Sequence, residues 1–137
     1  GYAQYEISTH ARPGRECRHN LAYWEGADYL GLGPSAWSTV GGRRWQNLPD
    51  TAEVLGAIES GVRPATGEET ITPATREAEI IAFGLRTGAG IERAKLAGKP
   101  GLVADMLAEG LLEESGQRIR LTPRGRLLAD EIAAELI

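Results

Sequence analysis

The chain has 137 residues and a mass of 14.7 kDa, which gives room for one domain, or for one domain with a small appendage. Its 15 lysines and arginines stand against 19 aspartates and glutamates, and this net charge of −4 argues against nucleic-acid binding through phosphates. No apolar run reaches the roughly 18 residues that a membrane-spanning helix needs, and the single Cys17 cannot form an internal disulfide. We therefore expect a cytoplasmic globular protein.

The N-terminal third predicts short strands and loops. Residues 1–8 alternate well enough for a strand, and no partner strand follows at hairpin distance, so we expect its partners upstream and treat the chain as a fragment. Residues 9–18 predict a polar loop, and residues 19–26 one or two helical turns that end near Gly26. Helical spacing would place His19 and Tyr23 on one face of these turns, and Asn20 and Trp24 on the adjacent face. Residues 28–33 predict a glycine-rich strand or turn, whose glycines let the backbone approach a neighbouring strand or a ligand. Gly41-Gly42 predicts a hairpin between residues 38–40 and 43–45.

From residue 49 the pattern becomes helical. Asp50 or Thr51 can cap a helix that runs to about residue 60, and Thr72-Pro73 begins a longer one. A third helix over residues 102–109 precedes a hairpin around Ser115-Gly116, and Thr122-Pro123 begins the last helix. The apolar positions expected to be buried in the second and last helices are Ile80, Ile81, Phe83, Leu85, Leu127, Leu128, Ile132 and Leu136. This order predicts a winged-helix-type unit over residues 73–137.

Residues 10–24 hold the densest cluster of chemically active side chains. The cluster contains both histidines, Cys17 and three arginines at a spacing of three. An exposed histidine at a helix start beside large aromatic rings suits an axial ligand to a flat macrocycle, and guanidinium groups suit its carboxylate arms. The alternative is structural: Tyr23 and Trp24 pack the helix onto a core, and His19 hydrogen-bonds locally. The residues alone favour this second interpretation.

Three other sequence patterns give weaker evidence for a function. Residues 31–36, GLGPSA, have the letters of a dinucleotide fingerprint, but a hairpin follows where that site needs a helix N-terminus. Cys17 lacks an orienting partner for nucleophilic work, and Arg43-Arg44 read as solvated charges on an edge strand. Residues 73–137 hold nine basic and ten acidic side chains, so the winged unit reads as a scaffold without a nucleic-acid partner.

Several motifs together resemble the C-terminal portion of radical-SAM proteins of the oxygen-independent coproporphyrinogen III oxidase-like family. They are YEIS at residues 5–8, THARP at 9–13, HNxxYW at 19–24, GLGPSAWS at 31–38, RRWQN at 43–47 and LTPRGRLLADEI at 121–132. The HNxxYW motif resembles the marker of the family's haem-chaperone branch. The resemblance covers the whole chain.

The resemblance implies an α+β fold in two parts. Residues 1–48 would form the last strands and loops of a partial TIM-type barrel, and residues 49–137 a helical, winged-helix-like C-terminal domain. The family binds its [4Fe–4S] cluster through CxxxCxxC, which this chain lacks. S-adenosylmethionine and the cluster are therefore expected in a longer parent protein only, which would supply the N-terminal half of the barrel as a partner, and we expect this piece to be inactive alone.

The resemblance also implies site residues. His19 is the candidate ligand to haem iron, with Asn20, Tyr23 and Trp24 around it, while Ala11 and Trp37 match positions near S-adenosylmethionine. This sequence departs from the branch at two positions: SAWS stands where many relatives have GAHS, and His10 stands where a phenylalanine is usual.

The implied function is that of a haem chaperone. Its parent would bind haem and S-adenosylmethionine, deliver haem to an acceptor protein in the cytoplasm, and make peripheral contact with a membrane. The alternative within the same family is an oxidase that decarboxylates coproporphyrinogen III to protoporphyrinogen IX. HNxxYW favours the chaperone.

Overall fold

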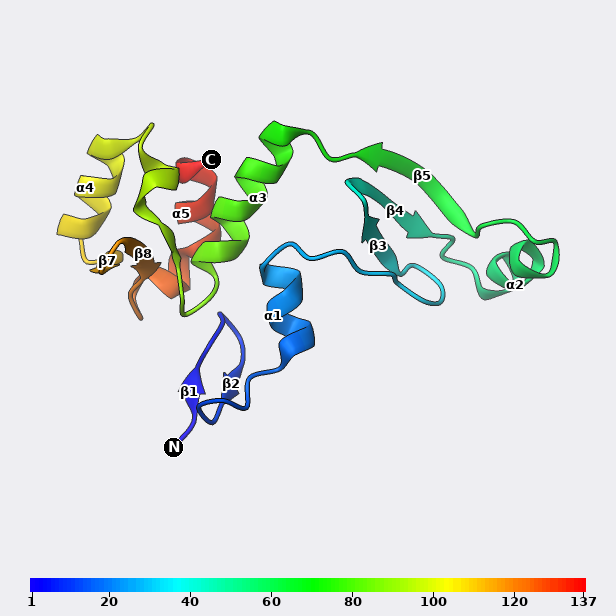
Figure 1. Cartoon of the computed structure of the whole chain (residues 1–137), viewed down its shortest axis with the longest axis horizontal. Coiled ribbons are helices and arrows are strands. Elements are labelled where there is room, and N and C mark those ends of the chain that lie inside the picture. The colour runs from blue at the N-terminus through cyan, green and yellow to red at the C-terminus, as the bar shows by residue number, and fades with distance from the viewer. The chain divides into compact units, whose positions relative to one another are not determined.

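The computed structural model describes residues 1–137 and has an α+β fold, as predicted. It contains five α-helices, two short 3₁₀ helices and three small sheets (Figure 1). Its contacts define two compact units: a first unit of residues 1–26 with 77–137, and a second unit of residues 27–76. The domain boundary expected between residues 48 and 49 refers to the barrel and the C-terminal domain of a longer parent protein, and it stays a prediction.

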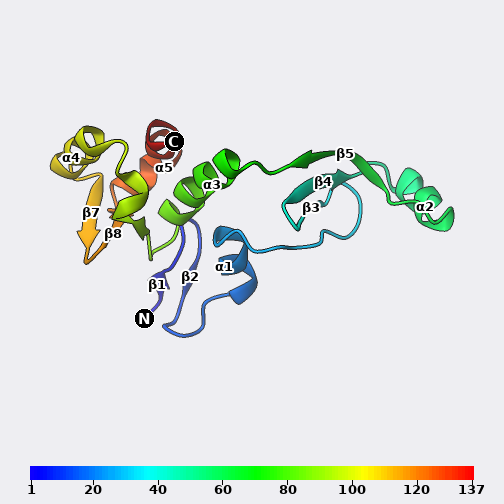
Figure 2. The ribbon, with the colours of Figure 1, turned by 45° about the horizontal axis from the view of Figure 1, so that its top comes forward.

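The first unit begins with a two-stranded antiparallel sheet. Strands β1 (Ala3–Gln4) and β2 (His10–Ala11) pair Ala3 with Ala11 and Gln4 with His10, and they lie side by side in both ribbon views (Figures 1 and 2). The expectation that no partner strand follows residues 1–8 was therefore wrong. Two-residue strands carry too little alternation to be recognised from sequence. Helix α1 (Arg18–Trp24) follows, as predicted.

The rest of the first unit is the winged-helix-type part. Its elements after α3 (Pro73–Leu85) are β6 (Ile91–Glu92), the 3₁₀ helix η1 (Arg93–Leu96), α4 (Pro100–Ala108), β7 (Leu112–Ser115), β8 (Arg118–Leu121), the 3₁₀ helix η2 (Gly125–Leu128) and α5 (Ala129–Leu136). The sheet order is β6-β8-β7, all antiparallel, so the predicted two-stranded wing has a third strand.

The core of this unit surrounds β8. Ile119 is fully buried, and α3, α4 and α5 contribute Leu85, Met106 and Ile132 around it. Ile80 of α3 was also expected to be buried, and it is 36% exposed. Two residues expected in the apolar stripe of the last helix are not buried either: Leu127 is 84% exposed and Leu128 40%. The chain there forms η2, whose three residues per turn displace side chains from an α-helical stripe.

The second unit is a three-stranded antiparallel sheet with one helix. Strands β3 (Trp37–Val40) and β4 (Arg43–Asn47) form the predicted hairpin, in which Gly41 and Gly42 have φ of 58° and 75°. Asp50 Oδ1 caps α2 (Thr51–Glu59) by accepting hydrogen bonds from two backbone amides, and β5 (Ala65–Thr70) adds a strand that was not expected.

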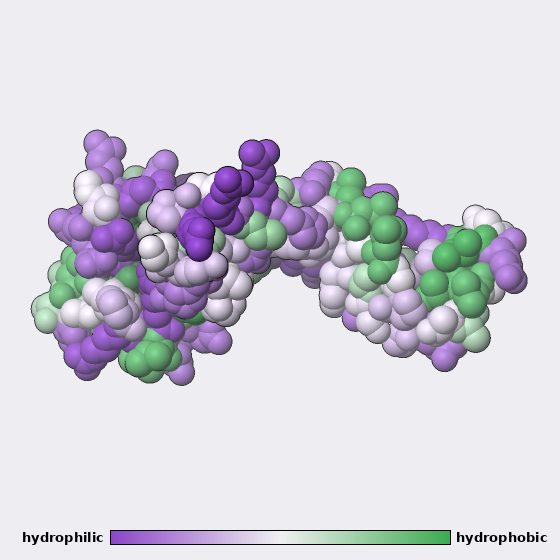
Figure 3. Space-filling view, turned by 90° about the horizontal axis from the view of Figure 1, so that it is seen from below, coloured by the Kyte–Doolittle hydropathy of each residue, from purple (hydrophilic) through white to green (hydrophobic).

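The second unit buries few of its apolar side chains. Trp45 and Val54 are buried, and the Arg63 guanidinium lies 4.6 Å from the centroid of the Trp45 ring. Figure 3 shows apolar patches exposed on this unit. The large apolar residues exposed there are Leu30, Leu32, Trp37, Val40, Leu55, Ile58 and Val62. Across the whole structure, no helix has the length and apolar character required to cross a membrane.

Candidate functional site

The HNxxYW motif lies on helix α1, which has two distinct faces. Successive residues of an α-helix are about 100° apart, so residues 19 and 23 share one face and residues 20 and 24 share the next. The helix ends at Trp24, and two residues later Gly26 stops it, with a φ of 71° and an amide that donates a hydrogen bond to the Tyr23 carbonyl at 3.0 Å. The two faces meet different surroundings.

The first face of α1 is exposed. His19 and Tyr23 are exposed, and their rings meet edge to face with centroids 4.7 Å apart and planes at 73°. An imidazole held against a neighbouring ring at the surface is accessible to a metal centre brought by a ligand. The predicted helix and the shared face of these two residues are confirmed.

The second face of α1 makes contacts with the rest of the first unit. Asn20 Nδ2 donates to Tyr5 Oη at 3.2 Å and to Thr9 Oγ1 at 3.3 Å. Trp24 packs edge to face on Phe83 of α3, with ring centroids 5.9 Å apart, and its buried indole N–H has no acceptor. The structural interpretation of the aromatic residues therefore holds for Trp24, while Tyr23 lies on the exposed face.

A buried carboxylate lies behind this second face. Glu6 is 1% exposed, and its Oε1 accepts hydrogen bonds from the Ser8 hydroxyl at 2.9 Å and from the Thr9 hydroxyl. Burial alone would raise the pKa of the Glu6 carboxyl, but the hydrogen bonds donated by Thr9, Ser8 and Asn20 together hold this pKa below its ordinary value. Oε2 is buried with no hydrogen-bond partner. Nothing in the sequence pattern indicated this group as buried.

Positive charge gathers in the loop before α1. Arg12, Arg15 and Arg18 are all exposed, and the Arg12 guanidinium lies 5.6 Å from the centroid of the Tyr2 ring. Glu16 is the acidic residue among them, and its Oε1 accepts a hydrogen bond from the Gly14 amide at 3.2 Å. The loop therefore offers guanidinium groups to an anionic ligand next to the helix that carries His19.

The remaining predicted site residues divide between the two units. Ala11 is buried in β2 and belongs to the first unit with α1, while Trp37 begins β3 in the second unit and is 48% exposed. A Cβ on Gly31 would lie 2.1 Å from the Trp37 carbonyl oxygen, so this glycine permits the close approach of a neighbouring strand. Of the two roles expected for the glycines of residues 28–33, approach to a strand or to a ligand, the first holds for Gly31. Asn47, which the sequence did not single out, is buried, and its Nδ2 donates to the carbonyls of Gly31 and Gly33.

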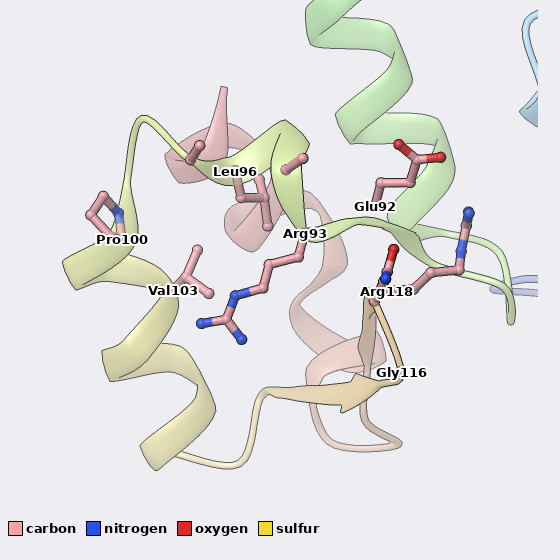
Figure 4. Close-up of a pocket in the computed structure, with 10 residues that line it drawn as sticks. Glu92, Arg93, Leu96, Pro100, Val103, Gly116 and Arg118 are labelled. Carbon is pink, nitrogen blue, oxygen red and sulfur yellow. The ribbon is translucent and has the colours of Figure 1, made fainter.

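A cavity of about 680 Å³ lies in the winged-helix-type part, between η1, α4 and the wing (Figure 4). Leu96, Pro100 and Val103 supply apolar surface, the Arg93 side chain extends into the space between α4 and the wing, and Arg118 comes from the wing. Arg93 pairs with Glu114, and Arg118 donates to the carbonyls of Ala89 and Gly90 at 2.8 and 2.6 Å. Arg93 thus has a carboxylate partner, whereas Arg118 is held by neutral carbonyl groups.

Comparisons with known proteins agree with this architecture. Residues 71–128 match the family model described as the HemN C-terminal domain. The chain is 40% identical over 138 residues to the haem chaperone HemW of Mycobacterium tuberculosis (strain CDC 1551), covering 100% of this chain and 35% of that protein. It is 31% identical to the haem chaperone HemW of Bacillus subtilis (strain 168), covering 96% of this chain and 37% of that protein.

The same fold occurs in a solved structure. A TM-score of 0.72 relates the chain to a structure described as the coproporphyrinogen III oxidase HemN from Escherichia coli, a radical-SAM enzyme. The match covers 99% of this chain and 37% of that one, at 20% sequence identity. The chain thus spans about a third of the length of the relatives that it matches.

These comparisons relate residues 71–128 to the HemN C-terminal domain family and the fold of the chain to that of HemN, as the sequence motifs predict. Within that family, the relatives that align along nearly the whole chain are named haem chaperone HemW, so the predicted resemblance to this branch is confirmed.

Proposed function

We propose that this chain is the part of a haem chaperone that presents an imidazole ligand, His19, to haem iron. The observation that carries the proposal is the exposed His19–Tyr23 face of α1, formed by a motif that resembles the marker of the chaperone branch. The parent binds haem and S-adenosylmethionine and delivers the haem to an acceptor protein.

The surroundings of His19 suit an anionic macrocycle. Neutral imidazole is a common axial ligand to haem iron, and the Tyr23 ring beside it restricts the orientation of the His19 ring. The exposed Arg12, Arg15 and Arg18 are suited to pair with the haem propionates. Asn20 and Trp24 shape the site from the second face of the same helix.

The remaining assignments concern the longer parent. Ala11 and Trp37 lie near S-adenosylmethionine there, and the [4Fe–4S] cluster binds to cysteines outside residues 1–137. The parent acts in the cytoplasm and touches a membrane only peripherally. Residues 1–48 belong to its barrel and residues 49–137 to its C-terminal domain.

The alternative function is oxidative decarboxylation of coproporphyrinogen III. It is favoured by the structural neighbour, which is described as a coproporphyrinogen III oxidase. At 20% identity that likeness supports the fold, whereas relatives at 31–40% identity over nearly the whole chain are named haem chaperones. The chaperone is therefore the better-supported function.

The test is a haem titration of the full-length protein followed by absorbance. We expect His19→Ala to lose or shift the Soret band of the complex, while His10→Ala, which changes the other exposed histidine of the same segment, leaves it in place. An unchanged spectrum and stoichiometry for His19→Ala would remove this residue from the site. Anaerobic turnover of coproporphyrinogen III by the full-length protein would favour the oxidase.

A further inference from the structure

Helix α1 depends on contacts with its surroundings for its position. It has seven residues, no side-chain N-cap and no buried residue. A helix this short is not stable alone, because nucleation is unfavourable and few hydrogen bonds follow it. The orientation of His19 must therefore come from the side chains that tie α1 to the rest of the first unit.

Asn20 provides this connection in the first turn of α1. Its Nδ2 donates to two hydroxyl oxygens, Tyr5 Oη at 3.2 Å and Thr9 Oγ1 at 3.3 Å. The Thr9 hydroxyl has a single proton, which it donates to the buried Glu6 carboxylate, so toward Asn20 it can only accept. The buried carboxylate thus fixes the direction of the chain of hydrogen bonds that ends at Asn20.

The segment that accepts hydrogen bonds from Asn20 is itself bonded to the winged-helix-type part. The Gly88 amide donates to the Tyr5 carbonyl at 2.8 Å, and Glu6 forms an antiparallel bridge with Thr87. Cβ on Gly88 would lie 3.4 Å from the Tyr5 carbonyl oxygen, so the two segments run close together. The connection therefore extends from α1 to the turn that follows α3.

Trp24 gives α1 a second contact one turn further along. Its ring packs on Phe83 of α3, on the same helix face as Asn20. Contacts at two successive turns restrain both rotation and tilt of the helix. The face that carries His19 and Tyr23 is the adjacent one, and it is left exposed.

We propose that Asn20 is a positioning residue, which holds α1 on the Tyr5–Thr9–Glu6 network so that His19 is presented in a fixed orientation. This inference rests on the proposed function, since it assigns Asn20 a role through His19 and not a contact with haem. Loss of two hydrogen bonds at this site should weaken haem binding about three- to tenfold, without changing the axial ligand.

The experiment compares the full-length wild type with Asn20→Leu, which keeps the number and branching of the side-chain heavy atoms and removes the amide group that donates both hydrogen bonds. Glu25→Gln is the matched control, because Glu25 is exposed just beyond α1. The readouts are the haem Kd, the Soret position at saturation, and amide hydrogen exchange of residues 18–24, with the β7–β8 hairpin as the internal reference for global stability. His19→Ala and the variant that combines it with Asn20→Leu complete a double-mutant cycle.

We expect Asn20→Leu to speed exchange in residues 18–24 about tenfold, leave β7–β8 unchanged, and raise the haem Kd with the Soret band in place. In the His19→Ala background it should weaken binding no further. Wild-type exchange in α1, a shifted Soret band, or additive losses in the double variant would overturn the inference. If His19→Ala binds haem like the wild type, the proposed function fails, while the exchange of α1 still decides whether Asn20 anchors the helix.

Discussion

Gly125 lies where the chain turns from the wing into η2, and replacing it with alanine tests the packing at this junction. Cβ on this residue would lie 1.9 Å from the carbonyl oxygen of Leu111. That oxygen accepts hydrogen bonds from the Thr122 amide at 3.0 Å and from the Thr122 hydroxyl at 3.3 Å. The Leu111 backbone must therefore move, and these two bonds must weaken.

Forcing an extra carbon into a packed interior costs about 1–3 kcal/mol of unfolding free energy. The first unit holds about 90 residues, which gives an unfolding entropy of roughly 0.19 kcal/mol/K. Gly125→Ala should therefore lower the Tm of this unit by about 5 to 15 °C.

Differential scanning calorimetry of the purified chain measures this change, with Gly98→Ala as the control. No atom lies within 4 Å of a Cβ on Gly98, and its φ is outside the left-handed region, so the control should melt within about 2 °C of the wild type. If Gly125→Ala also melts within 2 °C of the wild type, the close approach of Leu111 and Gly125 is wrong.

Two further predictions concern groups in different units. Asp50→Ala removes the cap of α2, so it should destabilise this helix by about 1 kcal/mol and speed amide exchange in residues 51–59. Asp50→Asn keeps a side-chain acceptor and should preserve the cap. Equal exchange in the wild type and both variants would contradict the capping role. The pKa of Glu6 is lowered in the folded state, so its stabilisation is present above the ordinary pKa of 4.5 and is lost as the pH falls through the lower folded-state pKa. Glu6→Gln should therefore flatten the acid side of a plot of unfolding free energy against pH, and an acid side as steep as that of the wild type would contradict this assignment.

The elements that the sequence predicts well are those with a local physical cause. Gly41-Gly42 can adopt the positive φ that a tight hairpin requires, and Asp50 supplies an acceptor for the free amides of α2. The hairpin around Gly116, with φ of 62°, follows the same rule. Such signals involve neighbours in the sequence, so they can be read without the fold.

The elements that were missed depend on distant partners. Strand β5 has the polar sequence ATGEET and is paired by β4, while β6 has two residues and is paired by β8. Neither segment alternates between apolar and polar residues, so only the pairing defines it. Leu127 and Leu128 were expected to be buried because the change from η2 to α5 cannot be seen in an unbroken helical pattern.

The candidate site shows the same division. Helical spacing alone pairs His19 with Tyr23 and Asn20 with Trp24, since only the period of the helix is needed. It could not tell which pair faces the protein. That depends on Tyr5, Thr9 and Phe83, which are contributed by other segments of the chain.

The most direct measurement of the central claim is the hyperfine coupling of ferric haem to nitrogen in the full-length protein, prepared with ¹⁵N-labelled histidine. An axial imidazole places a labelled nitrogen on the iron, so the wild-type complex should show a ¹⁵N coupling that His19→Ala lacks and His10→Ala retains. If the coupling persists in His19→Ala, a different residue ligates the iron, and the role assigned to the exposed face of α1 is wrong.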